Sequence, residues 1–151
     1  MSPPSASSAP APFTARASEW VGASGRIRVT EPAPGVFVSE VHGRATIGVI
    51  GVIIRFAEEM LAADRRLLVF HDWEDVSGYD AEARRQLTDW TDRIKPFWDG
   101  SHILFASPIV AMAVSVAGLT MRGRLSSYSS RKSWELALAK ACAARGGPAP
   151  T

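Results

Sequence analysis

Residues 67–87 read LLVFHDWEDVSGYDAEARRQL and carry the clearest structural signals in the chain. Leu67–Phe70 is a short, continuous apolar run, which is typical of a strand buried on both faces. The acid-rich segment Asp72–Tyr79 follows, and we expect a surface loop there. From Ala81 to about Trp98 the apolar residues return at helical spacing. The stretch therefore predicts a buried strand, a loop and an amphipathic helix in succession.

The predicted helix has a start signal, a stop signal and one apolar face. Asp80 stands directly before Ala81, where a carboxylate N-cap accepts hydrogen bonds from the free amides of the first turn. Asp99 and Gly100 are expected to close the helix. Its apolar residues recur every three or four positions and predict the buried face: Ala83, Leu87, Trp90, Ile94 and Phe97.

The flanking sequence continues the alternation of strands and helices. Upstream we predict a hairpin of two strands and then a helix, at Arg26–Thr30, Val36–Val41 (joined by the turn Glu31–Gly35) and about Thr46–Ala63. Downstream we predict strand, helix and strand at Ile103–Ala106, Pro108–Ala117 and Leu125–Tyr128, and a last helix that opens after Ser129 or Ser130. The order ββαβαβαβα predicts an α/β fold with a mixed, mostly parallel β-sheet packed against helices.

Length and composition suit a single domain. The chain has 151 residues, and we predict disordered tails at 1–24 and 145–151 around one domain at 25–144. The net charge of +2 is too small to argue for nucleic acid. The single cysteine, Cys142, excludes an internal disulfide and Cys-rich zinc patterns, and we expect it to be buried. With no signal-peptide pattern, a cytoplasmic location is predicted.

One uncharged stretch raises the question of a membrane span. Ile103–Met121 is 19 residues long without a charge, close to the length that crosses a bilayer. However, Ser107 and Pro108 form a typical helix start inside it. A short strand followed by a buried helix explains the stretch, and we predict no span.

The histidine and acids of the 67–87 stretch also suggest a metal or catalytic site, formed from His71, Asp72, Glu74, Asp75 and Asp80. Neighbours in a strand point to opposite faces, so His71 and Asp72 cannot share an ion if the strand extends to them. His42 and His102 complete no two-His-one-carboxylate pattern. The chain has no nucleophile elbow, P-loop or dinucleotide-binding motif. We therefore predict no catalytic residues, no metal and no cofactor.

The same stretch resembles the central segment of STAS-like domains, the fold of bacterial anti-sigma factor antagonists. There an apolar strand runs into an aspartate, matched by Asp72, and a second aspartate opens the next helix, matched by Asp80. SPIVAMAVSVAGL at 107–119 resembles the third helix of the family, and RLSSYSSRKSWELAL at 124–138 its last strand, turn and helix. The resemblance runs from about Arg26 to Ala143 and implies a STAS-like fold.

The resemblance also implies a regulatory, protein-binding role, with one departure. Ala81 stands where regulated members carry a phosphorylatable serine, and alanine cannot take the roughly two negative charges of a phosphate. Ser77 lies nearby, in the predicted turn. One branch of the family, small STAS-like proteins that resemble lipid-transfer folds, implies an apolar ligand instead.

The leading hypothesis is a non-enzymatic protein-interaction module. An exposed Trp73 among acids would be a natural binding anchor; the alternative is a half-buried core residue. The predicted partner-binding residues are Asp72, Trp73, Glu74, Asp75, Ser77, Tyr79, Asp80 and Arg84.

Three other roles are considered. The first is a pocket for a small apolar molecule or lipid under the apolar faces of residues 47–60 and 109–116, where a filled core is the default expectation. A basic patch, formed from Arg122, Arg124, Arg131 and Lys132 with Tyr128, is more typical of a solvated rim than of a nucleic-acid site. A homodimer is the third, because STAS-like domains pair and five tryptophans are many for this length.

Overall fold

The computed structural model describes residues 13–108, 110–112, 115 and 123–147, which build one six-stranded sheet. The strands are β1 (Arg16–Val21), β2 (Gly25–Ala33), β3 (Val36–Ala45), β4 (Leu67–Tyr79), β5 (Trp98–Phe105) and β6 (Leu125–Tyr128). They lie side by side in chain order. β2 is antiparallel to its two neighbours, β1 and β3, and β3 to β6 are parallel. The prediction of a mixed, mostly parallel sheet is confirmed.

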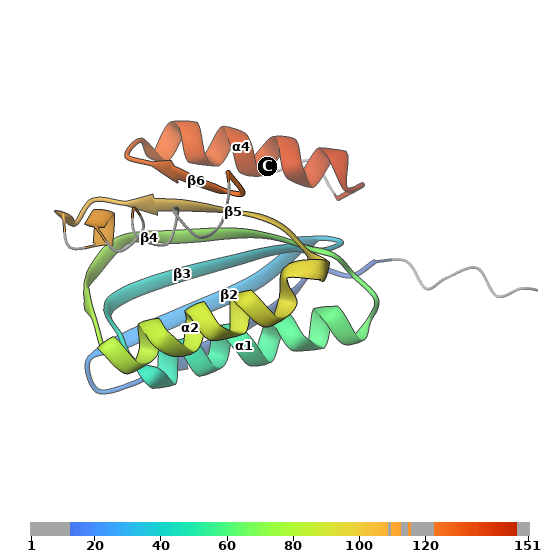
Figure 1. Cartoon of the computed structure of the whole chain (residues 1–151). Coiled ribbons are helices and arrows are strands. Elements are labelled where there is room, and N and C mark those ends of the chain that lie inside the picture. Colours follow the sequence, from blue (N-terminus) through green and yellow to red (C-terminus); the bar gives the residue numbers. More distant parts are fainter. Residues whose placement is uncertain (1–12, 109, 113–114, 116–122, 148–151) are drawn as a thin grey trace, which may run out of the picture.

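Helices cover both faces of the sheet (Figure 1). Helices α1 (Ile47–Ala62) and α2 (Ala81–Ile94) pack on one face, and α4 (Arg131–Ala144) packs on the other. The helix caps follow the expected chemistry at two of these starts. Thr46 accepts a hydrogen bond from the amide of Val49, and Ser130 accepts one from the amide of Ser133. These hydroxyls satisfy amides that the first helical turn leaves free.

Each face of the sheet has its own apolar core. Val69 on β4 packs toward α1 and α2, and its neighbour Phe70 packs with Trp134 of α4. A strand covered on both sides needs apolar residues at consecutive positions, which explains the run that starts at Leu67. Burial of each such large side chain contributes about 1.5–3 kcal/mol. Cys142 is buried in the core beneath α4, as predicted.

The predicted N-terminal tail is wrong in its second half. Arg16–Val21 is the edge strand β1, paired antiparallel with β2. Five of its six residues are exposed, so no alternating apolar pattern reveals the strand. Backbone pairing with β2 holds it in place, as does the Trp20 ring lying against Gly48 of α1.

A fully buried carboxylate ties the sheet to α1. Glu31 belongs to β2, whereas the sequence predicts that it starts a turn. Its oxygens accept hydrogen bonds from Arg65 Nε at 2.6 Å and Nη2 at 3.1 Å, and from the Gly35 amide at 3.0 Å. Arg16 Nε lies 3.4 Å away. One side chain thus connects the hairpin turn, the segment after α1 and the edge strand.

Strand β4 corrects the central prediction. It runs for 13 residues, from Leu67 to Tyr79, so the expected Asp72–Tyr79 loop is strand. β3 is long enough to pair with it throughout: His42 lies opposite Asp75, and Ala45 opposite Tyr79. Pairing with an adjacent strand supplies backbone hydrogen bonds to residues of low strand propensity, which local sequence does not report.

The predicted end of the second helix is also wrong. α2 stops at Ile94, a 3₁₀ turn covers Lys95–Phe97, and β5 already begins at Trp98. Proline at position 96 lacks an amide proton and disfavours a helical residue before it, which accounts for the tighter turn. Phe97 leaves the apolar face in consequence and is 54 % exposed.

The remaining predictions fall partly outside the described residues. The third helix, predicted at Pro108–Ala117, is described only at 108, 110–112 and 115, which are helical. The expected tail at 145–151 is wrong at Arg145, which donates hydrogen bonds to the Arg66 carbonyl and Asp99; residues 148–151 lie outside the described chain. Among the helices of the described residues, none has both the length and the apolar character needed to cross a bilayer.

Candidate functional site

The eight predicted partner-binding residues do not form one surface. Asp72 and Glu74 point to the α4 side of the sheet, where they meet Arg131. Trp73 points to the opposite side, toward α1 and α2. Successive side chains point to opposite faces because β4 is an extended strand here. In the loop that the sequence predicts, all of them could have faced the same side. The acid-rich segment therefore contributes to two separate sites.

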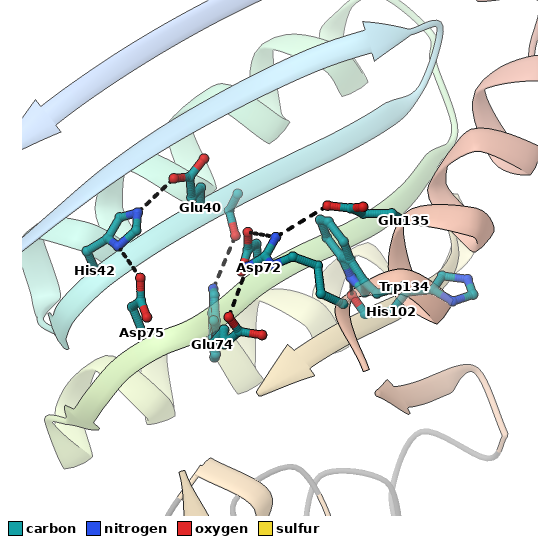
Figure 2. Close-up of polar contacts among 11 residues, drawn as sticks. Glu40, His42, Asp72, Glu74, Asp75, His102, Trp134 and Glu135 are labelled. Carbon is teal, nitrogen blue, oxygen red and sulfur yellow. Dashed lines mark hydrogen bonds and ion pairs between the residues drawn. The ribbon is translucent and has the colours of Figure 1, made fainter. Parts of the chain in front are cut away.

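On the α4 side, acids surround one arginine from the start of α4. Arg131 Nη1 and Nη2 each donate to a carboxylate oxygen of Asp72 at 2.9 Å. Glu74 and Glu135 lie 3.6 and 3.7 Å from the same guanidinium. Figure 2 shows these carboxylates converging between β4 and α4. The paired carboxylates raise the pKa of Arg131 further above its ordinary value, by hydrogen bonding first and by charge second.

A histidine bridges two more acids on the same side. His42 Nε2 lies 2.7 Å from Glu40, and Nδ1 lies 2.9 Å from Asp75 (Figure 2). Asp75 reaches this position because one extra residue of β4 bulges between Asp72 and Asp75. Each of these acids thus has a partner within the chain, either Arg131 or His42.

Asp80 lies at the predicted N-cap position of α2 but does not form the predicted capping hydrogen bond. Instead it accepts from Arg44 Nε at 2.6 Å, and Arg44 Nη2 donates to the Tyr79 carbonyl. The ion pair fixes the junction where β4 passes into α2.

On the α1 and α2 side the structure contains a cavity of about 100 Å³. It lies between the sheet and the two helices, and three of the predicted residues line it: Trp73, Tyr79 and Arg84. The sequence predicts a pocket under the first and third helices, but among the described residues α2 contributes more of the lining than α1, and Val110 is the residue of the third helix segment at the cavity. Apart from Arg84, the lining is largely apolar.

A buried polar chain forms part of the cavity wall. Ser39 Oγ lies 2.6 Å from His71 Nδ1 and accepts a hydrogen bond from Trp73 Nε1 at 3.2 Å. Burial lowers the pKa of His71 from 6.5 to about 3, because the charged imidazolium loses its hydration. The ring is therefore neutral at physiological pH. Trp73 is half-buried against this chain and the core, so it is not an exposed anchor.

Most of the partners in both sites lie far from the 67–87 stretch in the sequence. Ser39, Arg44 and Arg131 lie 32, 36 and 59 positions from the residues that they contact. The alternation of side chains along a strand is the one sequence pattern that indicates such a contact, because it places both Ser39 and His71 on the inward face.

The alternative sites are not assembled in the described part of the chain. Among its histidines, cysteines and acids, no group of three is placed to hold a metal ion. The basic patch is dispersed: Arg131 lies among acids, Arg124 donates to the Trp98 carbonyl, and Tyr128 contacts His102. Arg122 lies outside the described residues.

Comparisons with known proteins identify the fold. No protein-family model and no curated protein sequence matches the chain. A protein of the DUF3478 family with a SpoIIAA-like fold, from Shewanella loihica PV-4, is 13 % identical, with a TM-score of 0.59 over 76 % of this chain and 94 % of that one. An anti-sigma factor antagonist from Mycobacterium paratuberculosis is 17 % identical, with a TM-score of 0.54 over 76 % and 93 %. The anti-sigma factor antagonist SpoIIAA in its unphosphorylated form is 10 % identical, with a TM-score of 0.50 over 74 % and 96 %. The chain therefore has the SpoIIAA-like fold of STAS domains, as its sequence resemblance implied.

Proposed function

We propose that this protein is a non-enzymatic regulatory module that acts by binding a protein partner. Two of the similar structures are anti-sigma factor antagonists, which are named for opposing another protein. Fold similarity alone does not assign function, so the proposal rests on a surface of this chain.

The observation that carries the proposal is the rigid, exposed junction between β4 and α2. We call Asp75, Ser77, Asp80, Ala81 and Glu82 the junction surface; all but the half-buried Asp80 are exposed. The backbone beneath it is fixed, because the Asp80 amide donates to the Ala45 carbonyl and Arg44 clamps Asp80 and Tyr79. A preorganised surface loses little conformational entropy on binding.

Two residues define how this module would recognise its partner and how it would be controlled. Trp73 lies outside the junction surface, so recognition is polar and does not use that anchor. Ala81 has no hydroxyl at the first position of α2, so phosphorylation at this site cannot switch the module off. The partner is therefore bound irrespective of kinase activity on residue 81.

The test is quantitative recovery of partners by the tagged full chain from its source cells. Asp75→Lys and Ala81→Asp change the junction surface, and an aspartate at a helix N-terminus is tolerated by the helix dipole. Lys140→Glu, on the exposed side of α4, is the matched control. We expect a partner that both junction variants lose and the control retains. Equal recovery of every partner by folded junction variants, checked by circular dichroism, contradicts the proposal.

The cavity supports a second candidate function, the binding of a small ligand. Close packing normally fills the interior of a domain, so a cavity of about 100 Å³ beside a half-buried tryptophan is an exception. Native mass spectrometry of freshly purified protein tests it. A bound small molecule supports this function, and its consistent absence argues against it.

A further inference from the structure

Arg84 is an isolated cation at the cavity. It lies near the start of α2 and is exposed, and no carboxylate of the described residues lies within ion-pair distance of it. Nearby arginines are engaged: Arg85 pairs with Glu82 at 3.3 Å, and Arg44 pairs with Asp80 at 2.6 Å. The helix dipole disfavours a cation at this end of α2 and favours an anion. An anion bound at Arg84 would be stabilised both by the guanidinium and by the partial positive charge at the N-terminus of α2.

The rest of the described lining carries no charge. His71 is the only other titratable base there, and it is neutral because burial depresses its pKa. Ser39 Oγ lies 2.6 Å from His71 Nδ1, and no described residue forms a hydrogen bond with His71 Nε2. The wall thus presents a neutral imidazole among apolar side chains.

The cavity volume limits the size of the ligand. About 100 Å³ is smaller than the roughly 150 Å³ of a cavity that holds benzene. An apolar body of about four carbon atoms fits this space, and the acyl chain of a membrane lipid does not.

We propose that the cavity binds a small monocarboxylate, with a short apolar body between the sheet and α2 and its carboxylate on Arg84. This inference deepens the second candidate function and depends on it. Arginine matches a carboxylate with two parallel hydrogen bonds, so it selects the anion over a neutral molecule of equal length.

The experiment titrates the full chain with pentanoate, pentan-1-ol and dodecanoate, followed by amide chemical shifts. Arg84→Gln removes the cation, and Arg85→Gln is the matched control on the same helix. We expect pentanoate to shift residues that line the cavity, with affinity about tenfold weaker in Arg84→Gln and unchanged in Arg85→Gln. Pentan-1-ol should bind both variants equally.

The outcomes separate this inference from the function on which it rests. If pentanoate and pentan-1-ol bind in the cavity with affinities that Arg84→Gln leaves unchanged, the cavity is a ligand site without carboxylate selection and the inference fails. If no probe shifts cavity residues, both fail. Preferential binding of dodecanoate overturns the size limit and, with it, the proposed ligand class.

Discussion

Asp72 on β4 and Arg131 at the start of α4 lie 59 positions apart and form an ion pair with two hydrogen bonds of 2.9 Å. The pair attaches the helix on one face of the sheet to a central strand. It also gives a partner to the Asp72 carboxylate of β4, where pairing with β3 keeps the acid-rich segment extended. Asp72 is only 13 % exposed, so its charge is balanced by the arginine instead of by bulk water.

This pair should show measurable coupling in a double-mutant cycle of Asp72→Asn and Arg131→Gln. Because the contact is bidentate and Arg131 remains partly exposed, we expect about 1 kcal/mol in the free energy of unfolding, decreasing at 1 M salt. Urea denaturation measures it. The exposed pair Arg28 and Glu19, 3.4 Å apart, serves as the comparison and should couple near zero. Equal coupling energies in both pairs would contradict the role of Asp72 and Arg131 in attaching α4 to β4.

Glu31→Gln should destabilise the fold strongly. The substitution removes the buried negative charge that Arg65 and Arg16 share, and because both guanidinium groups are partly exposed we expect a cost of about 2–3 kcal/mol. Glu59→Gln removes the exposed carboxylate that meets Arg16 and should cost less than about 1 kcal/mol. The midpoints of urea unfolding report the difference. Similar midpoints for the two variants would mean that Glu31 does not organise the hairpin, α1 and β1.

The buried His71 predicts that stability falls with pH below neutrality. Its pKa is about 3 in the folded chain and 6.5 when unfolded, so between these values the unfolded state binds the extra proton. The stabilisation is complete above pH 6.5 and declines as the pH falls toward 3. We expect a loss of about 2 kcal/mol from pH 7 to pH 5 attributable to this group.

Two measurements isolate that contribution, since burial also lowers the pKa of His102. In His71→Asn, the pH-dependent loss between pH 7 and 5 should be smaller by about 2 kcal/mol than in the parent chain. In the parent chain, the His71 ring resonances should not titrate above pH 5. Titration near pH 6.5 would show that the ring is hydrated.

Two glycines of α1 should respond differently to alanine. Gly51→Ala should stabilise the protein by about 0.5–1 kcal/mol, because nothing lies within 4 Å of the added Cβ and glycine weakens a helix. At Gly48 the Cβ would lie 2.5 Å from the Trp20 ring, so the ring must move and the gain is lost. Thermal unfolding compares the two variants. Equal stabilisation would place Trp20 away from α1 in solution.

Gly48 therefore lies close to another segment of the chain, whereas Gly51 does not. Both lie in the same helical pattern, and only one faces another segment. The difference arises from β1, which lies within the predicted disordered tail.

The order of strands and helices from β2 onward could be predicted from the sequence, because strand and helix periodicities, caps and turns are local properties. The hairpin, the buried run at Leu67–Phe70, the amphipathic face of α2 and the Ser130 start of α4 all follow from neighbours within a few positions. Only the tertiary structure decided which acids of β4 meet Arg131 or His42 and that Trp73 turns inward. It also decided that Arg84 lies at a cavity with no carboxylate of the described residues beside it. Those outcomes depend on contacts between strands and helices that lie far apart in the chain. They also depend on pairing with β3, which extends β4 into acid-rich residues of low strand propensity.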